Sequence, residues 1–177
     1  MRIFFKLFLP VIFSLIISSC HRQVNDQKTW KDKEWVDYNQ IDIKENEEVY
    51  LICSLQRSGC MGKCPAYLVE IFSDETVKYH GMADVQMIGY FESTINIDQV
   101  NSIFESAEKI HYFDLSDQYP IGDLIVYDLP TTTSFLNLNG KKKKITNHNY
   151  GYPNELLEFE KQIDLVIYGL TWKTASK

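Results

Sequence analysis

The residues best suited to chemistry are the cysteines, of which the 177-residue chain has four: Cys20, Cys53, Cys60 and Cys64. Cys60 and Cys64 lie in the glycine-rich stretch SGCMGKCP, which predicts a loop. In an oxidising compartment a disulfide is the default for such a pair. Closing so short a loop stabilises a fold by only about 2 kcal/mol. Its main effect would be to hold the loop rigid.

Two other chemistries stay open for Cys60 and Cys64. A thioredoxin-like redox pair uses C-x-x-C at the start of a helix, whereas this spacing is one residue longer and Pro65 leads into a predicted strand. Copper(I) could use Met61 as a third soft ligand. A zinc site needs four nitrogen or sulfur ligands, which the sequence does not supply at a recognisable spacing. We favour the structural disulfide and predict no metal and no cofactor.

Cys53 has a different setting. It alternates with Val49, Leu51 and Leu55, and alternation of this kind predicts one face of a half-buried strand. A buried cysteine usually behaves as a small hydrophobic residue. The alternative is a disulfide to Cys60 or Cys64, which would leave the other thiol free.

Asp123, Asp128 and His148 are the remaining candidates, as residues of a ligand-binding loop. The two aspartates flank a predicted loop, and His148 lies in the aromatic stretch NHNYGY. Two carboxylates could act as acid and base in a hydrolase, but aspartate near a turn more often bonds its own backbone. The chain lacks the common hydrolase, zinc-protease and nucleotide-binding motifs. We therefore predict no catalytic residue.

The N-terminus, MRIFFKLFLPVIFSLIISSC, carries a charged start, a short apolar run and small residues before Cys20. This order is typical of a secretory signal, and the final Ser-Ser-Cys resembles the lipobox of bacterial lipoproteins. The resemblance implies cleavage after residue 19 and lipidation of Cys20. Removing residues 1–19 takes away Arg2 and Lys6 and no acids, which changes the net charge from −6 to −8. An acidic chain argues against binding to nucleic acid.

The rest of the chain predicts a polar tether over residues 20–48, one globular domain over 49–172 and a short tail over 173–177. Strands are indicated at 49–55, 66–72, 76–80, 85–94, 132–138 and 143–147. One helix is indicated from Ile97 to Ile110, with a capping box at Asn96 and Gln99, and another from Pro153. The fold class is α+β, with two helices on one face of an antiparallel sheet of five or six strands, in the order β-β-β-β-α-β-β-α.

The segment from Gly59 to Tyr67 resembles a family of uncharacterised bacterial envelope domains built around a Gly/Pro-Cys-x-Gly-x-Cys-Pro-x-Tyr segment. Supporting matches occur at residues 77–81, 128–132 and from Pro153 to Trp172. One departure is Glu75, where the family's hairpin usually has glycine. The resemblance implies a fold and a location but no activity.

These observations favour a non-catalytic binding or assembly lipoprotein of the cell envelope. Its expected place is a bacterial membrane, the outer one and facing the periplasm, with an envelope protein as a candidate partner. The alternative is a thiol–disulfide redox or metal-carrying protein that uses Cys60 and Cys64.

Overall fold

The computed structural model describes residues 49–122 and 129–175. The predicted signal peptide, Cys20, the tether, Asp123 and Asp128 lie outside these residues. In the described part, an eight-stranded sheet has the order β5-β7-β6-β1-β2-β3-β4-β8. Its strands are β1 (Leu51–Arg57), β2 (Ala66–Phe72), β3 (Thr76–Ala83), β4 (Gly89–Thr94), β5 (Gln118–Tyr119), β6 (Thr132–Leu138), β7 (Lys141–Asn147) and β8 (Lys173–Thr174).

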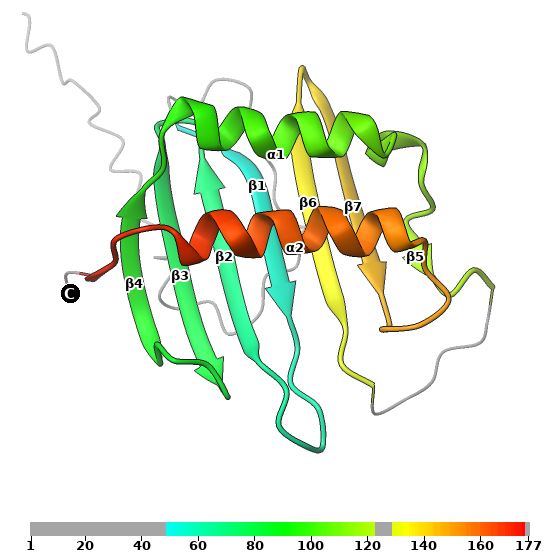
Figure 1. Ribbon diagram of the computed structural model, residues 1–177, viewed down its shortest axis with the longest axis horizontal. Coiled ribbons are helices and arrows are strands. Elements are labelled where there is room, and N and C mark those ends of the chain that lie inside the picture. Colours follow the sequence, from blue (N-terminus) through cyan, green and yellow to red (C-terminus); the bar gives the residue numbers. More distant parts are fainter. Residues whose placement is uncertain (1–48, 123–128, 176–177) are drawn as a thin grey trace, which may run out of the picture.

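The predicted α+β class is confirmed, but the sheet is larger than expected. Helices α1 (Ile97–Lys109) and α2 (Asn154–Tyr168) lie across the strands on one face of the sheet (Figure 1). The pairings are antiparallel except that of β5 with β7. The two extra strands, β5 and β8, have two residues each. A strand that short cannot show an alternating pattern, so the predicted order of elements was incomplete.

The predicted helix ends are largely confirmed. The Asn96 side chain accepts a hydrogen bond from the backbone N–H of Gln99, and the Gln99 side chain accepts one from the N–H of Asn96. This reciprocal pair is the predicted capping box. Helix α2 begins one residue later than expected, because Pro153 is its N-cap, and Gly169 is its C-cap.

The main core lies between the sheet and the helices. It includes Leu55, Val69, Phe159 and Ile163, all fully buried. A smaller cluster of Leu51, Leu68 and Phe135 belongs to the other side of the sheet. The prediction that Leu51 shares a face with Cys53 was therefore wrong. The register of β1 against β2 shifts between these two residues, and such a bulge turns the following side chains to the opposite face.

In the β2–β3 turn, Glu75 has a backbone conformation that favours glycine, the residue that the resemblance leads one to expect there. Glu75 has φ 65°, a left-handed conformation that glycine adopts at much lower cost. We expect Glu75→Gly to raise the free energy of unfolding by about 0.5 kcal/mol, since relief of strain exceeds the added chain entropy. Urea denaturation measures this. The control, Glu158→Gly inside helix α2, should lower stability by about 1 kcal/mol. A loss of stability in Glu75→Gly would contradict the prediction.

Candidate functional site

The glycine-rich loop between β1 and β2 places Cys60 and Cys64 at disulfide-bond distance, with their Cα atoms 5.6 Å apart. Both cysteines are half-buried, and Met61 between them is 89 % exposed. The start of the loop is tied to the start of β6, because the backbone N–H of Thr131 donates to Ser58 Oγ at 2.7 Å. The loop is therefore anchored at a point far away in the sequence.

Cys53 is a free, buried cysteine that packs in the main core. Burial raises the pKa of its thiol to about 12. A thiol with so high a pKa stays protonated at neutral pH, and the protonated form is a poor nucleophile. This setting agrees with the predicted role as a small hydrophobic core residue.

His148 follows β7, and its backbone N–H donates to the carbonyl of Tyr119 at 2.9 Å. Since Asp123 and Asp128 lie outside the described residues, the proposed ligand loop has no described geometry beyond this contact. No group of three or more potential metal ligands occurs within residues 49–122 and 129–175.

A polar network that the sequence did not predict joins β1, β2, β6 and α2. The Arg57 guanidinium donates from Nε to Tyr67 Oη at 2.9 Å, from Nη1 to Thr132 Oγ1 at 3.0 Å and from Nη2 to Asp164 Oδ2 at 2.7 Å. The Tyr67 hydroxyl in turn donates to Asp164 Oδ1. The side chains of Arg57 and Asp164 are 18 % and 19 % exposed, so the ion pair is mostly shielded from water.

Burial keeps Tyr67 in its neutral form within this network. Burial raises the pKa of Tyr67 far above its usual range; the charge of Arg57 opposes this rise, and that of Asp164 adds to it. Tyr67 therefore remains a hydrogen-bond donor to Asp164 across the physiological pH range. Because these groups bond one another, the network fixes the positions of three strands and a helix.

Tyr67 and Asp164 also line a cavity of about 330 Å³, while Arg57 and Thr132 do not. The cavity lies beside the β1–β2 loop that carries Cys60 and Cys64, which we call the disulfide loop. It is placed between the β3–β4 connection and the C-terminal end of α2. Figure 1 shows the β1–β2 loop and the β3–β4 connection at the same, lower end of the strands. The lining residues are Pro65, Tyr67, Tyr79, Asp84, Val85, Gln86, Met87, Asp164, Ile167, Tyr168 and Trp172. We call this space the aromatic cavity.

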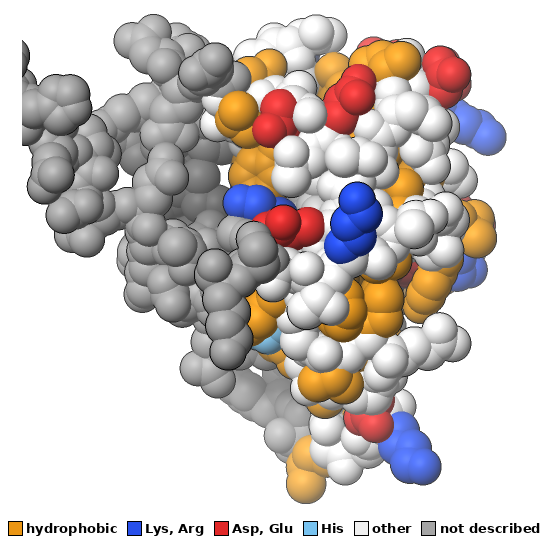
Figure 2. Space-filling view, turned by 90° about the vertical axis from the view of Figure 1, so that its left-hand side faces the viewer, with side chains coloured by type: hydrophobic (Ala, Val, Ile, Leu, Met, Phe, Trp, Pro, Cys, Tyr) orange, Lys and Arg blue, Asp and Glu red, His pale blue; other side chains and the backbone are white. Residues whose placement is uncertain are grey.

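Aromatic rings form much of its wall. The rings of Tyr67 and Tyr79 are stacked with centroids 5.6 Å apart, and Trp172 is tilted against Tyr79 at 5.4 Å. The indole Nε1 of Trp172 donates to the carbonyl of Ile167 at 3.3 Å, which fixes the ring against α2. In Figure 2, which faces the β4 edge of the sheet, hydrophobic side chains form a band across the lower half, with charges mainly above and below it.

The β3–β4 connection closes one side of the aromatic cavity and depends on Gly81. A Cβ at Gly81 would lie 1.8 Å from the backbone oxygen of Met87 and 2.9 Å from a methyl of Val85. Only glycine lets the connection pack so closely against β3, so its position is set by this contact.

We expect Gly81→Ala to lower the free energy of unfolding by about 2 kcal/mol, because the connection must move away from β3. Thermal and urea denaturation measure this. The control is Gly59→Ala, where the nearest atom to a new Cβ is 3.9 Å away; it should change stability by less than about 0.5 kcal/mol. Equal effects of the two substitutions would show that the contact is unimportant.

A second buried polar pair adjoins the Arg57 network. Glu160 on α2 is 1 % exposed, and its Oε1 accepts a hydrogen bond from Asn147 Nδ2 at 2.6 Å. Burial raises the pKa of Glu160 to about 7; Arg57 lowers it, Asp164 raises it and the bond from Asn147 lowers it. Glu160 is therefore a buried carboxyl that titrates near neutral pH.

The sequence pattern indicates both the Arg57 network and the buried Glu160, because their charged residues occupy predicted core positions. Arg57 continues the alternation of Cys53 and Leu55 on β1, and Glu160 and Asp164 fall on the apolar stripe of α2. A charged residue at a core position is usually paired. What the sequence did not supply was the partner, since Arg57 and Asp164 meet only when α2 packs across β1.

Comparison with known proteins identifies the family of this domain. Residues 52–167 match the domain of unknown function DUF6438. The chain belongs to this family. No curated protein and no solved structure matches it. The match ends just before Tyr168, so two aromatic residues of the cavity wall, Tyr168 and Trp172, follow the matched span of the DUF6438 domain.

Three of the four segments that carried the resemblance supply residues to the aromatic cavity. The cysteine segment supplies Tyr67, the β3 segment supplies Tyr79, and Trp172 ends the last segment. Thr132, from a fourth segment, bonds Arg57 behind the wall. These segments are far apart in the sequence, and the cavity is where they meet.

No helix among residues 49–122 and 129–175 has the length and hydrophobicity needed to cross a membrane.

Proposed function

We propose that this protein is a lipid-anchored, non-catalytic binding domain of the bacterial cell envelope, and that the aromatic cavity is its ligand site. The observation that carries the proposal is the cavity itself, with a volume of about 330 Å³ and a wall of tyrosine and tryptophan side chains. Sites for small molecules are typically concave, largely apolar and of this size, with a few polar groups that orient the ligand.

Rigidity of the wall supports the proposal. The Arg57 network holds Tyr67 and Asp164 in place, and the disulfide loop ends next to Pro65 at the rim. A site whose side chains are already fixed loses little conformational entropy when a ligand binds. The convergence on the cavity of segments that are distant in the sequence adds to this support.

NMR spectra of the isotope-labelled full-length protein test the ligand site. Mixtures of small metabolites are added, and the side-chain signals of Tyr79 and Trp172 are followed, with those of Tyr150 as the reference outside the cavity. A binding compound should move the cavity signals and leave Tyr150 unchanged. If no mixture moves the cavity signals, the binding function is wrong.

The anchor is proposed from the lipobox resemblance at Cys20, which would tether the domain to the outer membrane on its periplasmic side. Cells grown with an alkyne-bearing fatty acid should label the parent protein but not Cys20→Ala, which should also leave the membrane fraction. Cys53→Ala is the matched control and should keep its label. Labelling of Cys20→Ala at the parent level would exclude this anchor. In-cell crosslinking then tests for an envelope protein partner.

The second candidate function is thiol–disulfide exchange or metal carriage by Cys60 and Cys64. It is favoured by one observation, that both sulfur-bearing residues are half-exposed on a loop beside the cavity. Alkylation of the native protein followed by mass spectrometry separates the candidates. A bond that withstands mild reductant supports the structural role, whereas ready reduction and re-oxidation would support redox chemistry.

A further inference from the structure

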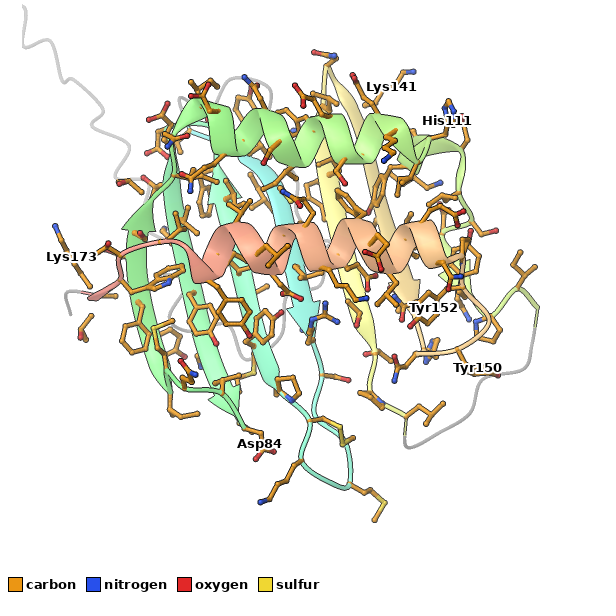
Figure 3. The ribbon with its side chains drawn as sticks, viewed as in Figure 1. Asp84, His111, Lys141, Tyr150, Tyr152 and Lys173 are labelled. Carbon is orange, nitrogen blue, oxygen red and sulfur yellow. A yellow bond between two sulfur atoms is a disulfide. The ribbon has the colours of Figure 1, made fainter. Side chains whose placement is uncertain are left out.

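The charges around the aromatic cavity have one sign. Among the described residues that line the cavity, only Asp84 and Asp164 are charged, and none is a lysine, arginine or histidine. Asp164 is balanced by Arg57 from behind the wall. Asp84 is exposed just beyond the lower end of β3, and Lys173 lies apart from it, higher up at the left of Figure 3. Asp84 therefore places a negative charge at the rim, and no basic side chain among the lining residues balances it.

Helix α2 adds to this negative potential. Its last residues, Ile167 and Tyr168, line the cavity, so the C-terminal end of the helix lies beside it. The aligned peptide dipoles give the C-terminus of a helix a partial negative charge, and a cation near it is stabilised. This contribution comes from the backbone and does not depend on the aspartates.

The aromatic rings supply a third contribution. The faces of tyrosine and tryptophan rings carry the negative part of the ring quadrupole. An organic cation over such a face is attracted to it, and methylated ammonium groups are bound in this way by cages of aromatic side chains. Tyr67, Tyr79, Tyr168 and Trp172 provide several such rings around one cavity.

From these three observations we propose that the aromatic cavity binds a small organic cation through an alkylated ammonium group. The inference rests on the proposed function, since it names the class of ligand for that site. The cation would lie against the rings, with Asp84 at the rim and the end of α2 beside it. An anionic ligand would meet repulsion from all three sources.

Two other cavities indicate a class of ligand less clearly than the aromatic cavity does. One, near His111 and Lys141, is lined by both acidic and basic side chains. The other follows the lysines of β7, where Lys143 is already paired with Asp117 at 2.7 Å. Neither combines one sign of charge with aromatic walls.

The test compares choline with its neutral isostere, in which carbon replaces the quaternary nitrogen. Both are titrated into full-length protein, and the indole N–H signal of Trp172, identified with Trp172→Phe, is followed by NMR. We expect choline to bind roughly tenfold more tightly than the isostere, because only choline gains the cation–π and charge attraction. Added salt should weaken choline binding and leave the isostere unchanged.

Two exposed residues test the wall without endangering the fold. Asp84→Asn and Tyr168→Leu should each weaken choline binding roughly threefold. The matched controls, Asp98→Asn on α1 and Tyr50→Leu before β1, lie away from the cavity and should have no effect. Equal binding of choline and the isostere would overturn the cation assignment while supporting the cavity as a ligand site. If choline moves no cavity signal, the cation assignment is also wrong. The proposed function fails only if the metabolite mixtures move none either.

Discussion

Asp164→Ala is expected to lower the free energy of unfolding by about 3 kcal/mol, the largest loss that we predict for a single polar residue. Removing one partner of a shielded ion pair leaves the other charge without compensation, which costs about 3–5 kcal/mol when burial is complete. The lower end applies here, because Arg57 and Asp164 keep 18 % and 19 % exposure. Arg57 would retain only the hydroxyls of Tyr67 and Thr132. Urea unfolding at neutral pH measures the change.

Two controls isolate the cause of this loss. Glu158→Ala breaks an exposed pair with Lys161 on the same helix, at 2.9 Å, and should cost less than about 0.5 kcal/mol. The double variant Arg57→Met with Asp164→Leu replaces both charges by apolar side chains and should recover most of the lost stability. If Asp164→Ala costs no more than Glu158→Ala, the network does not support the wall of the cavity.

Glu160→Gln is expected to remove a large pH dependence of stability. The pKa of Glu160 is raised from 4.5 to about 7 by burial, so the folded state holds its proton more tightly than the unfolded state. Its contribution is fully present below pH 4.5 and is lost as the pH rises through about 7. A shift of this size corresponds to about 3 kcal/mol.

The measurement is the difference in unfolding free energy between Glu160→Gln and the parent protein. This difference should rise in favour of the variant by about 3 kcal/mol between about pH 4 and pH 8. Glutamine keeps an oxygen that can accept the bond from Asn147, so the comparison isolates the charge. Glu158→Gln, an exposed change two residues away on the same helix, should give a flat difference. Parallel pH profiles for the parent and Glu160→Gln would contradict the prediction.

Much of the fold could be predicted because its longer elements carry periodic patterns. The helix from Ile97 was visible from its capping box, and the strand over residues 132–138 lies where it was predicted. The Asn139-Gly140 dipeptide follows this strand, and both of its residues have positive φ, the geometry that this dipeptide favours in a two-residue hairpin. Local interactions determine these features, so a local pattern reveals them.

The features that sequence reasoning missed depend on distant partners. Strands β5 and β8 exist only because β7 and β4 offer unpaired edges to two residues each. The shift of Leu51 to the other side of the sheet comes from a bulge against β2. The aromatic cavity likewise needs Tyr67, Tyr79 and Trp172 to be brought together from three elements, and no spacing in the chain indicates that meeting.

The central position of β1 has a consequence for how the chain folds. Strands β1 to β4 form a run of neighbouring hairpins. Strand β1 also pairs with β6, although strands β2 to β5 and helix α1 lie between β1 and β6 along the chain. Closing so long a loop is entropically costly, and contacts of this kind slow folding. We therefore expect the β1–β4 meander to form early and the β6–β7 hairpin to join later. The rate-limiting step would then be the union of two independently formed pieces along the β1–β6 seam.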